Sequence, residues 1–564
     1  MYQDNFEDEF VGDIDVDVVV ESYTGADEFE DGEITKEMED MQIQMALMQQ
    51  KHQEQIRAGI ESIPDHIRDF LLYFHRTFTQ GNSSKVAMIY EYQFNKLSEK
   101  TYSKTPWPDP RYVSALVNDT GIFLTLYREM YYRHIYSKMQ PTIEDRILSF
   151  ENYCELFNYI LNSDTPVTLE LPNKWLWDII DEFIYQFQTF CLYRNNVSKK
   201  TEREIETLKS STVSKSNITK QLYVGVHGGD LIEAAGEYGS CQLYKMLGYF
   251  SLIGLLRVHC LLGDYTLALQ SLENIDLGNH RALYTRVPAC HVTLYYYVGF
   301  SYLMMRRYSD ATRVFGTILN FVSRTRQYQV KSFHFDVINK KADQMYALLA
   351  MCMALSPSRV DEQTHSMLRE KYGEQQNRLQ RGGEEALATF QELFMHACPK
   401  FISPNIPNYD AILAELAKEY DSQAYGDANQ AAPALSYNKM ELQNYQMKIF
   451  LHEVSLQIVV PNLRSLLKMY TSMKLDKLAS FMDILPSELH NQLLVFKMRS
   501  LQLKFNGGSS LLDGESTVST DLGFAIDDDV VHIAENKIGR RYADWFIRNN
   551  SKLMELISTM EAKV

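Results

Sequence analysis

Three side chains able to bind phosphate recur at intervals of seven residues near the C-terminal end of the chain: His490, Lys497 and Lys504. The apolar pattern of the segment 486–503 predicts a helix, which puts all three on one face. Such a face can contact nucleic acid, as the recognition helix of a helix-turn-helix protein does. Leu494 and Leu501 lie between the three, which favours an ordinary solvated face over an RNA contact.

Other clusters of charged residues have simpler explanations than chemistry. The three acids Asp527–Asp529 favour a polar hairpin tip over a metal site, because further ligands are missing from the pattern. Arg306 and Arg307 can bind phosphate, but cations at a helix C-terminus also complement the helix dipole. The sequence contains none of the usual nucleotide-binding, metalloprotease, nucleophile-elbow or calcium-loop motifs. We therefore predict no catalytic residues, no metal and no cofactor, and expect a protein that is not an enzyme.

The cysteine pattern and the apolar segments indicate where the protein works. The seven cysteines are scattered and never form a C-x-x-C pair, which argues against disulfides and zinc and fits a reducing compartment. The N-terminal residues lack the order of a signal peptide. The uncharged stretch Val287–Met305 contains Pro288 and His291, so we expect a buried helix there and no membrane span. The sequence predicts a soluble, cytoplasmic protein with no membrane contact.

Most of the net charge is concentrated in the N-terminal part. The 564 residues include 56 basic and 73 acidic side chains, for a net charge of −17. Residues 1–50 hold 16 of the acids and one lysine, so the remainder carries 55 basic and 57 acidic residues. A nearly neutral body excludes a strongly basic nucleic-acid binder. We expect residues 1–58 to form an acidic, disordered tail.

From residue 59 onward the apolar pattern is helical almost everywhere. The segment 173–187 carries two apolar stripes, which indicates a helix packed on both sides. The segments 261–268 and 304–311 align at an offset of 43 residues. This internal repeat predicts a mainly α chain with a tetratricopeptide-like, right-handed helical solenoid over residues 59–319.

Small and large residues in the second copy of the repeat occur at the spacing of a tetratricopeptide helix pair. Gly299 and Ala311 are small where two helices would cross closely. Tyr302 and Phe315 are large where the next helix would pack. The period is longer than the usual one, so the repeats are degenerate.

The sequence changes character after residue 455. Three helical segments precede two short apolar runs separated by an acidic turn, in the order 458–470, 474–482, 486–503, 522–526 and 530–533. Three helices and a hairpin are the components of a winged helix, which we place at about 456–535. Before the two runs, the polar, glycine-bearing residues 506–520 are expected to be a mobile hairpin tip.

Residues 536–564 are predicted to form a final amphipathic helix. It has no obvious core left to join, which favours bundling with helices of a partner.

Several strings in the body are long enough to identify a family: Thr105–Pro108, Tyr131–Tyr136, Phe157–Leu161, Leu171–Phe187, Ala235–Gly239, Leu243–Phe250, Leu368–Gly373, Cys398–Phe401 and Arg540–Tyr542. They resemble the L subunits of eukaryotic translation initiation factor 3, a family of PCI-domain scaffold proteins, over about residues 60–560. The acidic residues 1–58 match no pattern of the family.

The resemblance implies a PCI domain over 320–535 and a bundling helix over 536–564. It implies a non-catalytic subunit that supports binding of the small ribosomal subunit and assembly of the pre-initiation complex. The implied partners are other PCI-type initiation-factor subunits, notably K and E. A scaffold subunit of the proteasome lid or the COP9 signalosome, or a direct RNA-binding module, remain alternatives. The subunit interface would use Phe524, Ile526, Val531, Ile533, Ile538, Tyr542, Trp545, Leu553 and Ile557.

Overall fold

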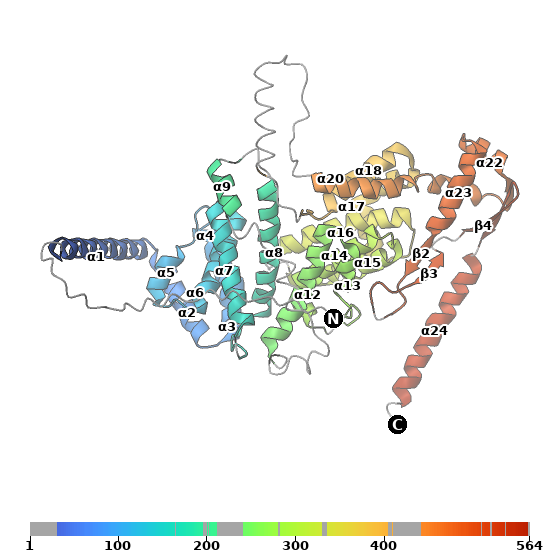
Figure 1. The fold of residues 1–564 in the computed structure, drawn as a ribbon. Helices are drawn as coiled ribbons and strands as arrows, with labels where there is room; N and C mark the ends of the chain where they lie inside the picture. The colour runs from blue at the N-terminus through green and yellow to red at the C-terminus, as the bar shows by residue number, and fades with distance from the viewer. Residues whose placement is uncertain are drawn as a thin grey trace, which may run out of the picture.

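The protein is a long, mainly helical chain with two small β-sheets near its C-terminal end (Figure 1). This confirms the predicted mainly helical class. The computed structural model describes residues 31–163, 165–195, 200, 202–210, 238, 241–273, 275–279, 282–329, 335–403, 409, 441–508, 510–518, 522–535 and 537–561.

The first part of the chain begins with a long helix in the region expected to be disordered. Helix α1 covers Asp31–Glu61, and its described side chains are mostly exposed, so the second half of the predicted tail is helical. Residues 1–30 of that tail lie outside the described part. The following elements are α2 (Asp65–Thr79), α3 (Ser83–Met88), the π-helix η1 (Ile89–Phe94), α4 (Asn95–Thr101), α5 (Pro110–Val117), α6 (Ile122–Lys138), α7 (Ile143–Leu161), α8 (Asn173–Asn195) and α9 (Glu202–Ser210).

The middle of the chain is a series of helices in which each packs on the next. Helix α8 contacts α12, α12 contacts α14, and contacts continue from α14 through α15 and α16 to α17, α18 and α20. Sequential packing of this kind buries a continuous core between neighbours. The elements are α12 (Gln242–Leu262), α13 (Tyr265–Gln270), the 3-10 helix η4 (Leu283–Arg286), α14 (Pro288–Met304), α15 (Tyr308–Gln329), α16 (Phe335–Leu355), α17 (Glu362–Arg381), α18 (Gly383–Ala397) and α20 (Glu441–Ser455).

The C-terminal part combines short helices with all five strands of the described residues. Strand order is β1-β5-β4 in one sheet and β2-β3 in the other, with antiparallel pairing throughout. The elements are α21 (Val460–Leu467), β1 (Ser472–Lys474), α22 (Leu475–Met482), α23 (Pro486–Ser500), β2 (Leu501–Lys504), β3 (Glu515–Val518), β4 (Leu522–Asp527), β5 (Val530–Glu535) and α24 (Lys537–Glu561).

A buried carboxylate joins three helices of the N-terminal part. Glu129 of α6 is fully buried and accepts hydrogen bonds from Arg133, from the Tyr153 hydroxyl of α7 at 3.2 Å and from the Trp175 indole of α8 at 3.2 Å. Because a buried charge is costly unless it is paired and hydrogen-bonded, these partners hold α6, α7 and α8 in one relative placement. Burial raises the pKa of the neighbouring Glu182 to about 7, although Arg133 opposes that shift.

The two copies of the predicted repeat share one helix–turn–helix geometry. At the end of α12, Gly263 has a φ of +84°, and the Asp264 amide donates to the carbonyl of His259 at 2.9 Å. At the end of α14, Arg306 has a φ of +63°, and the Arg307 amide donates to the carbonyl of Tyr302 at 2.9 Å. Each position is shifted by the predicted 43 residues, so the repeat exists in the backbone as well as in the sequence.

The apolar stretch Val287–Met305 is a core helix, as predicted. Helix α14 is buried over almost its whole length. Of the described helices, only α12 is long and apolar enough to cross a membrane by length and composition. The interior of the protein holds 67% of its most apolar window, so α12 has the burial of a core helix as well.

Replacing Gly299 by alanine is expected to destabilise the protein. An added Cβ would lie 2.4 Å from Cε1 of the fully buried Phe315, and overpacking of this kind costs about 1–3 kcal/mol. The matched control is Gly248→Ala in α12, where an added Cβ meets no atom within 4 Å. The control should gain up to about 1 kcal/mol of helix propensity. Thermal unfolding, monitored by circular dichroism, checks both variants. If Gly299→Ala melts at the same temperature as the parent, the helices do not cross closely at Gly299.

Replacing Glu182 by glutamine is expected to stabilise the protein at neutral pH. The pKa of Glu182 rises from 4.5 to about 7 on folding, so the folded chain holds more protons than the unfolded chain between these values. Stability of the parent therefore falls as the pH rises through this window, whereas glutamine does not titrate. As the pH rises through this window, the free energy of unfolding of the variant should gain on the order of 1 kcal/mol relative to that of the parent.

Urea denaturation at several pH values between about 5 and about 8 tests this difference. The control Glu151→Gln changes an exposed residue of α7. The raised pKa of Glu182 would be contradicted if the free energies of unfolding of Glu182→Gln and the parent differed by the same amount at every pH. It would also be contradicted if the control showed the same pH trend.

Candidate protein-interaction surface

The C-terminal module, which we define as α21 to β5 (residues 460–535), has an apolar core of its own. This core is separate from that of the helical body, the helices from α2 to α20 (residues 65–455). Helices α21, α22 and α23 pack against the sheet β1-β5-β4, an arrangement consistent with the predicted winged helix. Strand β4 is an edge of this sheet within the described residues. The buried core residues are Leu463, Leu467, Met473, Leu475, Leu478, Ala479, Leu489, Leu493, Phe496, Leu522 and Val531.

The strands of this module were only partly predicted from the sequence. The hairpin of β4 and β5 lies where the two apolar runs indicate it, with Asp527 and Val530 flanking the turn. The third strand, β1, pairs Met473 with Val531, and its three residues are too few to show an alternating pattern. The predicted helix 486–503 is too long: α23 ends at Ser500, and the next four residues pair with β3 as strand β2.

The predicted interface residues of the hairpin point toward the module's own core. Val531 is fully buried, which corrects its assignment as a contact residue. Phe524, Ile526 and Ile533 are partly buried against the same core, and the Phe524 ring stacks on Phe496 at 5.6 Å. Strand β4 lies at an edge of the described sheet, and edge strands are typical places for pairing with a strand of another protein.

Helix α24 presents the most exposed set of large apolar side chains among the described residues. It extends away from the module in Figure 1. Of the predicted residues, Trp545 is 60% exposed, Leu553 55% and Ile557 49%. The side chains of Ile538 and Tyr542 lie outside the described part. Also exposed on α24 are the apolar residues Phe546, Ile547, Met554, Leu556 and Met560. An exposed apolar surface of this kind is typical of an interaction site.

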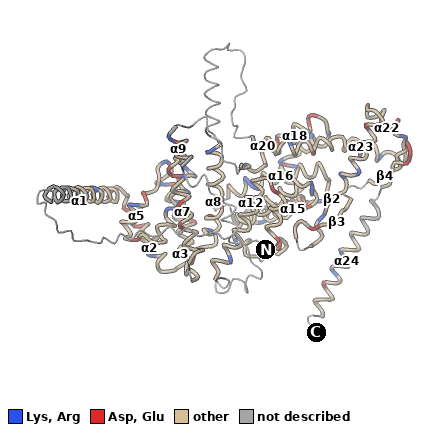
Figure 2. Tube along the Cα trace, in the orientation of Figure 1, with Lys and Arg blue, Asp and Glu red and all other residues tan. Residues whose placement is uncertain are grey.

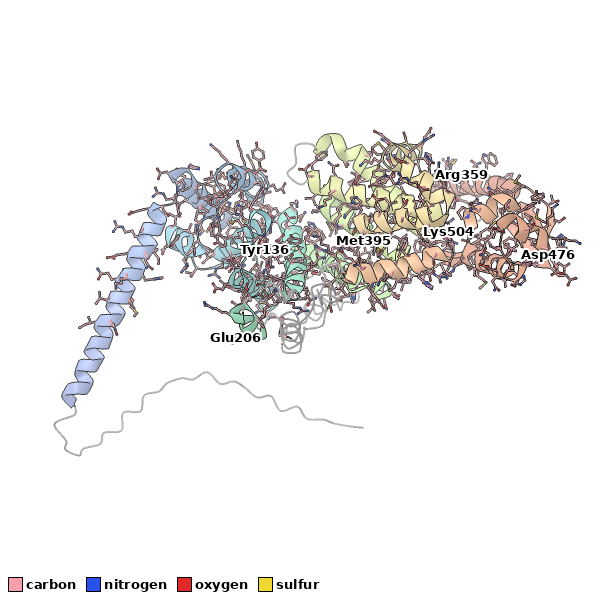
Figure 3. All side chains as sticks on the ribbon, turned by 90° about the horizontal axis from the view of Figure 1, so that it is seen from above. Tyr136, Glu206, Arg359, Met395, Asp476 and Lys504 are labelled. Atoms are coloured by element: carbon pink, nitrogen blue, oxygen red, sulfur yellow. The ribbon has the colours of Figure 1, made fainter. Side chains whose placement is uncertain are left out.

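The three residues predicted to contact RNA do not share one helix face. His490 and Lys497 lie on α23, but Lys504 lies on β2 because the helix has already ended. Figure 3 shows Lys504 on the side of the C-terminal module next to the helical body. Figure 2 shows basic and acidic residues interspersed along the described chain. An RNA contact through these residues stays a prediction.

A buried arginine fastens the C-terminal module to the helical body. Arg307, at the start of α15, is 2% exposed. Its guanidinium donates to the carbonyls of Leu511 at 3.1 Å, Leu512 at 2.9 Å and Asp513 at 2.9 Å, all in the loop between β2 and β3. The Tyr302 hydroxyl donates to the Leu511 carbonyl at 2.9 Å. The loop predicted to be a mobile tip is therefore docked on α14 and α15.

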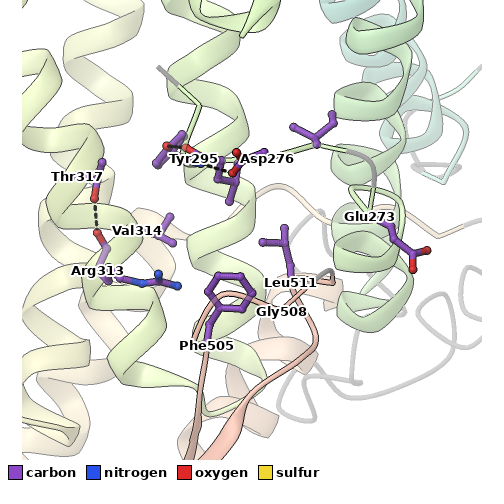
Figure 4. A pocket seen from close by; sticks show the side chains of 12 residues that line it. Glu273, Asp276, Tyr295, Arg313, Val314, Thr317, Phe505, Gly508 and Leu511 are labelled. Carbon is purple, nitrogen blue, oxygen red and sulfur yellow. Dashed lines mark hydrogen bonds between the residues drawn. The ribbon is translucent and has the colours of Figure 1, made fainter. Parts of the chain in front are cut away.

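The carboxylate of Asp310 completes this anchor. It accepts from Arg307 Nε at 2.9 Å and from the Phe505 amide at 3.1 Å. Asp310 is 1% exposed, so the ion pair is shielded from water. Next to it lies a cavity of about 520 Å³, with Phe505 and Leu511 of the loop on one side and α14 and α15 on the other (Figure 4). Its lining carries charges of both signs.

Titratable groups in the core support packing. Burial raises the pKa of the Cys260 thiol to about 12 and that of the Tyr302 hydroxyl to about 12. Both groups therefore stay neutral at physiological pH. All seven cysteines are free thiols. Within the described part of the chain, no group of three or more His, Cys, Asp or Glu side chains is placed to hold a metal ion.

Replacing Arg307 by methionine should weaken the attachment of the module. The variant removes the guanidinium from the buried Asp310 carboxylate and from three carbonyls, of which one keeps the Tyr302 hydroxyl as a donor. Breaking a buried ion pair costs about 3–5 kcal/mol. Urea denaturation should show this loss, and limited proteolysis should cut within residues 505–514. Arg324→Met, at an exposed position of the same helix, is the control. If Arg307→Met has the same free energy of unfolding as the parent and the same resistance to protease, Arg307 is not the anchor.

Known proteins of one family are similar to this chain over most of its length. Residues 145–553 match the family model described as RNA polymerase I-associated factor PAF67. A eukaryotic translation initiation factor 3 subunit L from Mycosarcoma maydis is 47% identical over 89% of this chain and 75% of its own. The subunits L of Homo sapiens and Danio rerio are each 45% identical over 88% of this chain, which covers 91% and 89% of theirs. The chain therefore belongs to the eukaryotic translation initiation factor 3 subunit L family.

Proposed function

We propose that this protein is a non-catalytic scaffold subunit of the eukaryotic translation initiation factor 3 complex in the cytoplasm. Its role would be to support binding of the small ribosomal subunit and assembly of the pre-initiation complex. The relatives named above support the initiation factor over the proteasome lid and the COP9 signalosome. The observation that supports the proposal is the exposed apolar surface of α24, whose described side chains belong to none of the apolar cores of the described residues.

The architecture proposed for this role has three parts. The sequentially packed helices would form a tetratricopeptide-like, right-handed solenoid over residues 59–319, followed by a PCI domain over 320–535. The repeated turn geometry at Gly263 and Arg306 supports the solenoid. The separate apolar core of α21–α23 and the β1-β5-β4 sheet supports a distinct winged helix. Residues 536–564 would serve as the bundling helix.

The subunit contacts would be of two physical kinds. The apolar side chains of α24 would enter a bundle with helices of other PCI-type subunits, K and E in particular, and burial of each large side chain contributes about 1.5–3 kcal/mol. The edge strand β4 would accept a strand from a neighbouring winged helix, which adds directional backbone hydrogen bonds. The first supplies most of the affinity, and the second fixes orientation.

Replacing Trp545 by aspartate is expected to remove the protein from its complex without unfolding it. Trp545 is 60% exposed, so the free protein should keep its melting temperature. A charge at an aromatic contact residue of an interface costs about 2 kcal/mol or more, which corresponds to at least about a tenfold loss of association. Affinity purification of the tagged protein, followed by quantification of initiation-factor subunits and small ribosomal subunits, measures the loss.

Met88→Asp is the matched control, because Met88 is also 60% exposed and lies on α3, far from the C-terminal module in sequence. The control should co-purify with the complex like the parent. Equal recovery of partners with Trp545→Asp would remove the bundling role of α24. Parent protein that sediments alone would overturn the scaffold function itself.

A further inference from the structure

The side chain of Arg146 is buried where α6, α7 and α8 meet. Arg146 belongs to α7 and is 9% exposed. Its guanidinium lies 5.5 Å from the ring centroid of Tyr136 on α6, which Figure 3 labels, and 4.5 Å from that of Tyr193 on α8. Aromatic rings attract a cation, but they carry no net charge that could neutralise it.

The guanidinium of Arg146 is short of acceptors and of a counter-charge. The Tyr136 hydroxyl accepts a hydrogen bond from it, whereas Nε and Nη1 are buried and have no hydrogen-bond partner. Within the described part of the chain, no carboxylate forms an ion pair with Arg146. Because arginine stays protonated inside proteins, a positive charge is left in the interior uncompensated, which is costly.

Acidic groups on the surrounding helices have other hydrogen-bond partners. Asp145 of α7 accepts two hydrogen bonds in the N-terminal cap of its own helix, at 3.0 and 2.8 Å. Glu182 of α8 accepts from a glutamine of its own helix at 3.0 Å, and Glu204 of α9 accepts from the Tyr193 hydroxyl at 2.8 Å. Burial raises the pKa of the Tyr136 hydroxyl, and it raises that of Tyr193 to about 12. Neither tyrosine therefore supplies a negative charge at neutral pH.

A small void adjoins this guanidinium. Its volume is about 10 Å³, which is about the space that one water molecule needs. Phe150 and Phe187 on its wall are only half-buried, so a small ion can reach the void from the surface. The edges of aromatic rings carry a partial positive charge, which favours an anion over a cation. The lining residues are Arg146, Gln186 and six aromatic residues, Tyr136, Phe150, Tyr153, Phe183, Phe187 and Phe190.

We propose that this void is a binding site for a small monatomic anion, namely chloride. The N–H groups at Nε and Nη1 of Arg146 donate to the ion, which supplies the missing counter-charge and joins α6, α7 and α8 at one point. A phosphate or carboxylate group fits less well, because the void has the volume of one water molecule. No residue of α24 or of the C-terminal module lines the void, so this inference is independent of the proposed function.

The line width of the chloride nuclear magnetic resonance signal tests the proposal with the full-length protein. Chloride that exchanges with a protein site gives a broader signal, so the parent should broaden it in proportion to protein concentration. Bromide, which is also monatomic, should reverse the broadening by displacing chloride. Sulfate at the same ionic strength should be at least about tenfold less effective, because it is too large for the void. These measurements need no variant.

Two substitutions at Arg146 and one control locate the site. Arg146→Gln removes the charge and should bind chloride at least about tenfold more weakly than the parent. Arg146→Lys keeps a cation and should retain more of the broadening than Arg146→Gln. The control Arg76→Gln removes an exposed arginine of α2 and should broaden the signal like the parent. Circular dichroism of each variant verifies that it is folded.

Thermal unfolding gives a second readout, because an ion that binds only the folded chain raises its melting temperature. Replacing chloride by gluconate at constant ionic strength should lower the melting temperature of the parent and of Arg76→Gln by about 2 °C or more. The melting temperature of Arg146→Gln should not change.

The proposal is overturned if the parent gives no broadening that bromide reverses, or if sulfate displaces chloride as well as bromide does. Equal broadening by the parent and Arg146→Gln would also overturn it, because chloride would then be an adventitious ion only, bound at exposed cations. Equal broadening by Arg146→Gln and Arg146→Lys would show that the charge at this position does not hold the ion.

Discussion

The guanidinium of Arg307 connects two parts of the chain that are about two hundred residues apart. It donates to three consecutive carbonyls of the β2–β3 loop and to the carboxylate of Asp310. A guanidinium suits this task because its donors form a rigid fork and it stays protonated inside a protein. The charge is compensated by Asp310, and the carbonyls that it satisfies would otherwise be costly to bury. The placement of the C-terminal module on the helical body depends on this set of bonds.

The surfaces available for contact follow from that placement. With the loop docked on α14 and α15, α23 and β2 come to lie beside the turn at Arg306, and a cavity of about 140 Å³ forms between them. The strand pairing of β2 with β3 stops α23 at Ser500. Helix α24 begins after β5, and its large apolar side chains from Trp545 onward are exposed.

Several parts of the structure were predictable because the signal is local. Gly299 and Phe315 occur at tetratricopeptide spacing, and in the structure the ring fills the space that a side chain on Gly299 would occupy. The segment of α14 is apolar on all sides, which is typical of a buried helix, and α14 is buried over almost its whole length. The hairpin of β4 and β5 was visible from two apolar runs around an acidic turn. Trp545, Leu553 and Ile557 were predicted as subunit-interface residues; they are exposed in the structure, and their contact role stays a prediction.

Other parts could not be predicted because their causes lie elsewhere in the chain. Leu501 and Leu503 continue the apolar pattern of α23, yet pairing with β3 makes them strand. Val531 belongs to an apolar run whose inward face only the packing of α22 and α23 defines.

The sequence alone determined the helical class, the repeat, the family and the amphipathic final helix, since each rests on composition, periodicity or similarity along the chain. Only the tertiary structure decided which arginine is buried and which lies at a surface. Arg306 and Arg307 are neighbours of the same type. Arg306 has a left-handed backbone between α14 and α15 and an exposed side chain, whereas the side chain of Arg307 is directed into the loop 505–514. Burial depends on what packs against a side chain, and residues two hundred positions away supply that packing here.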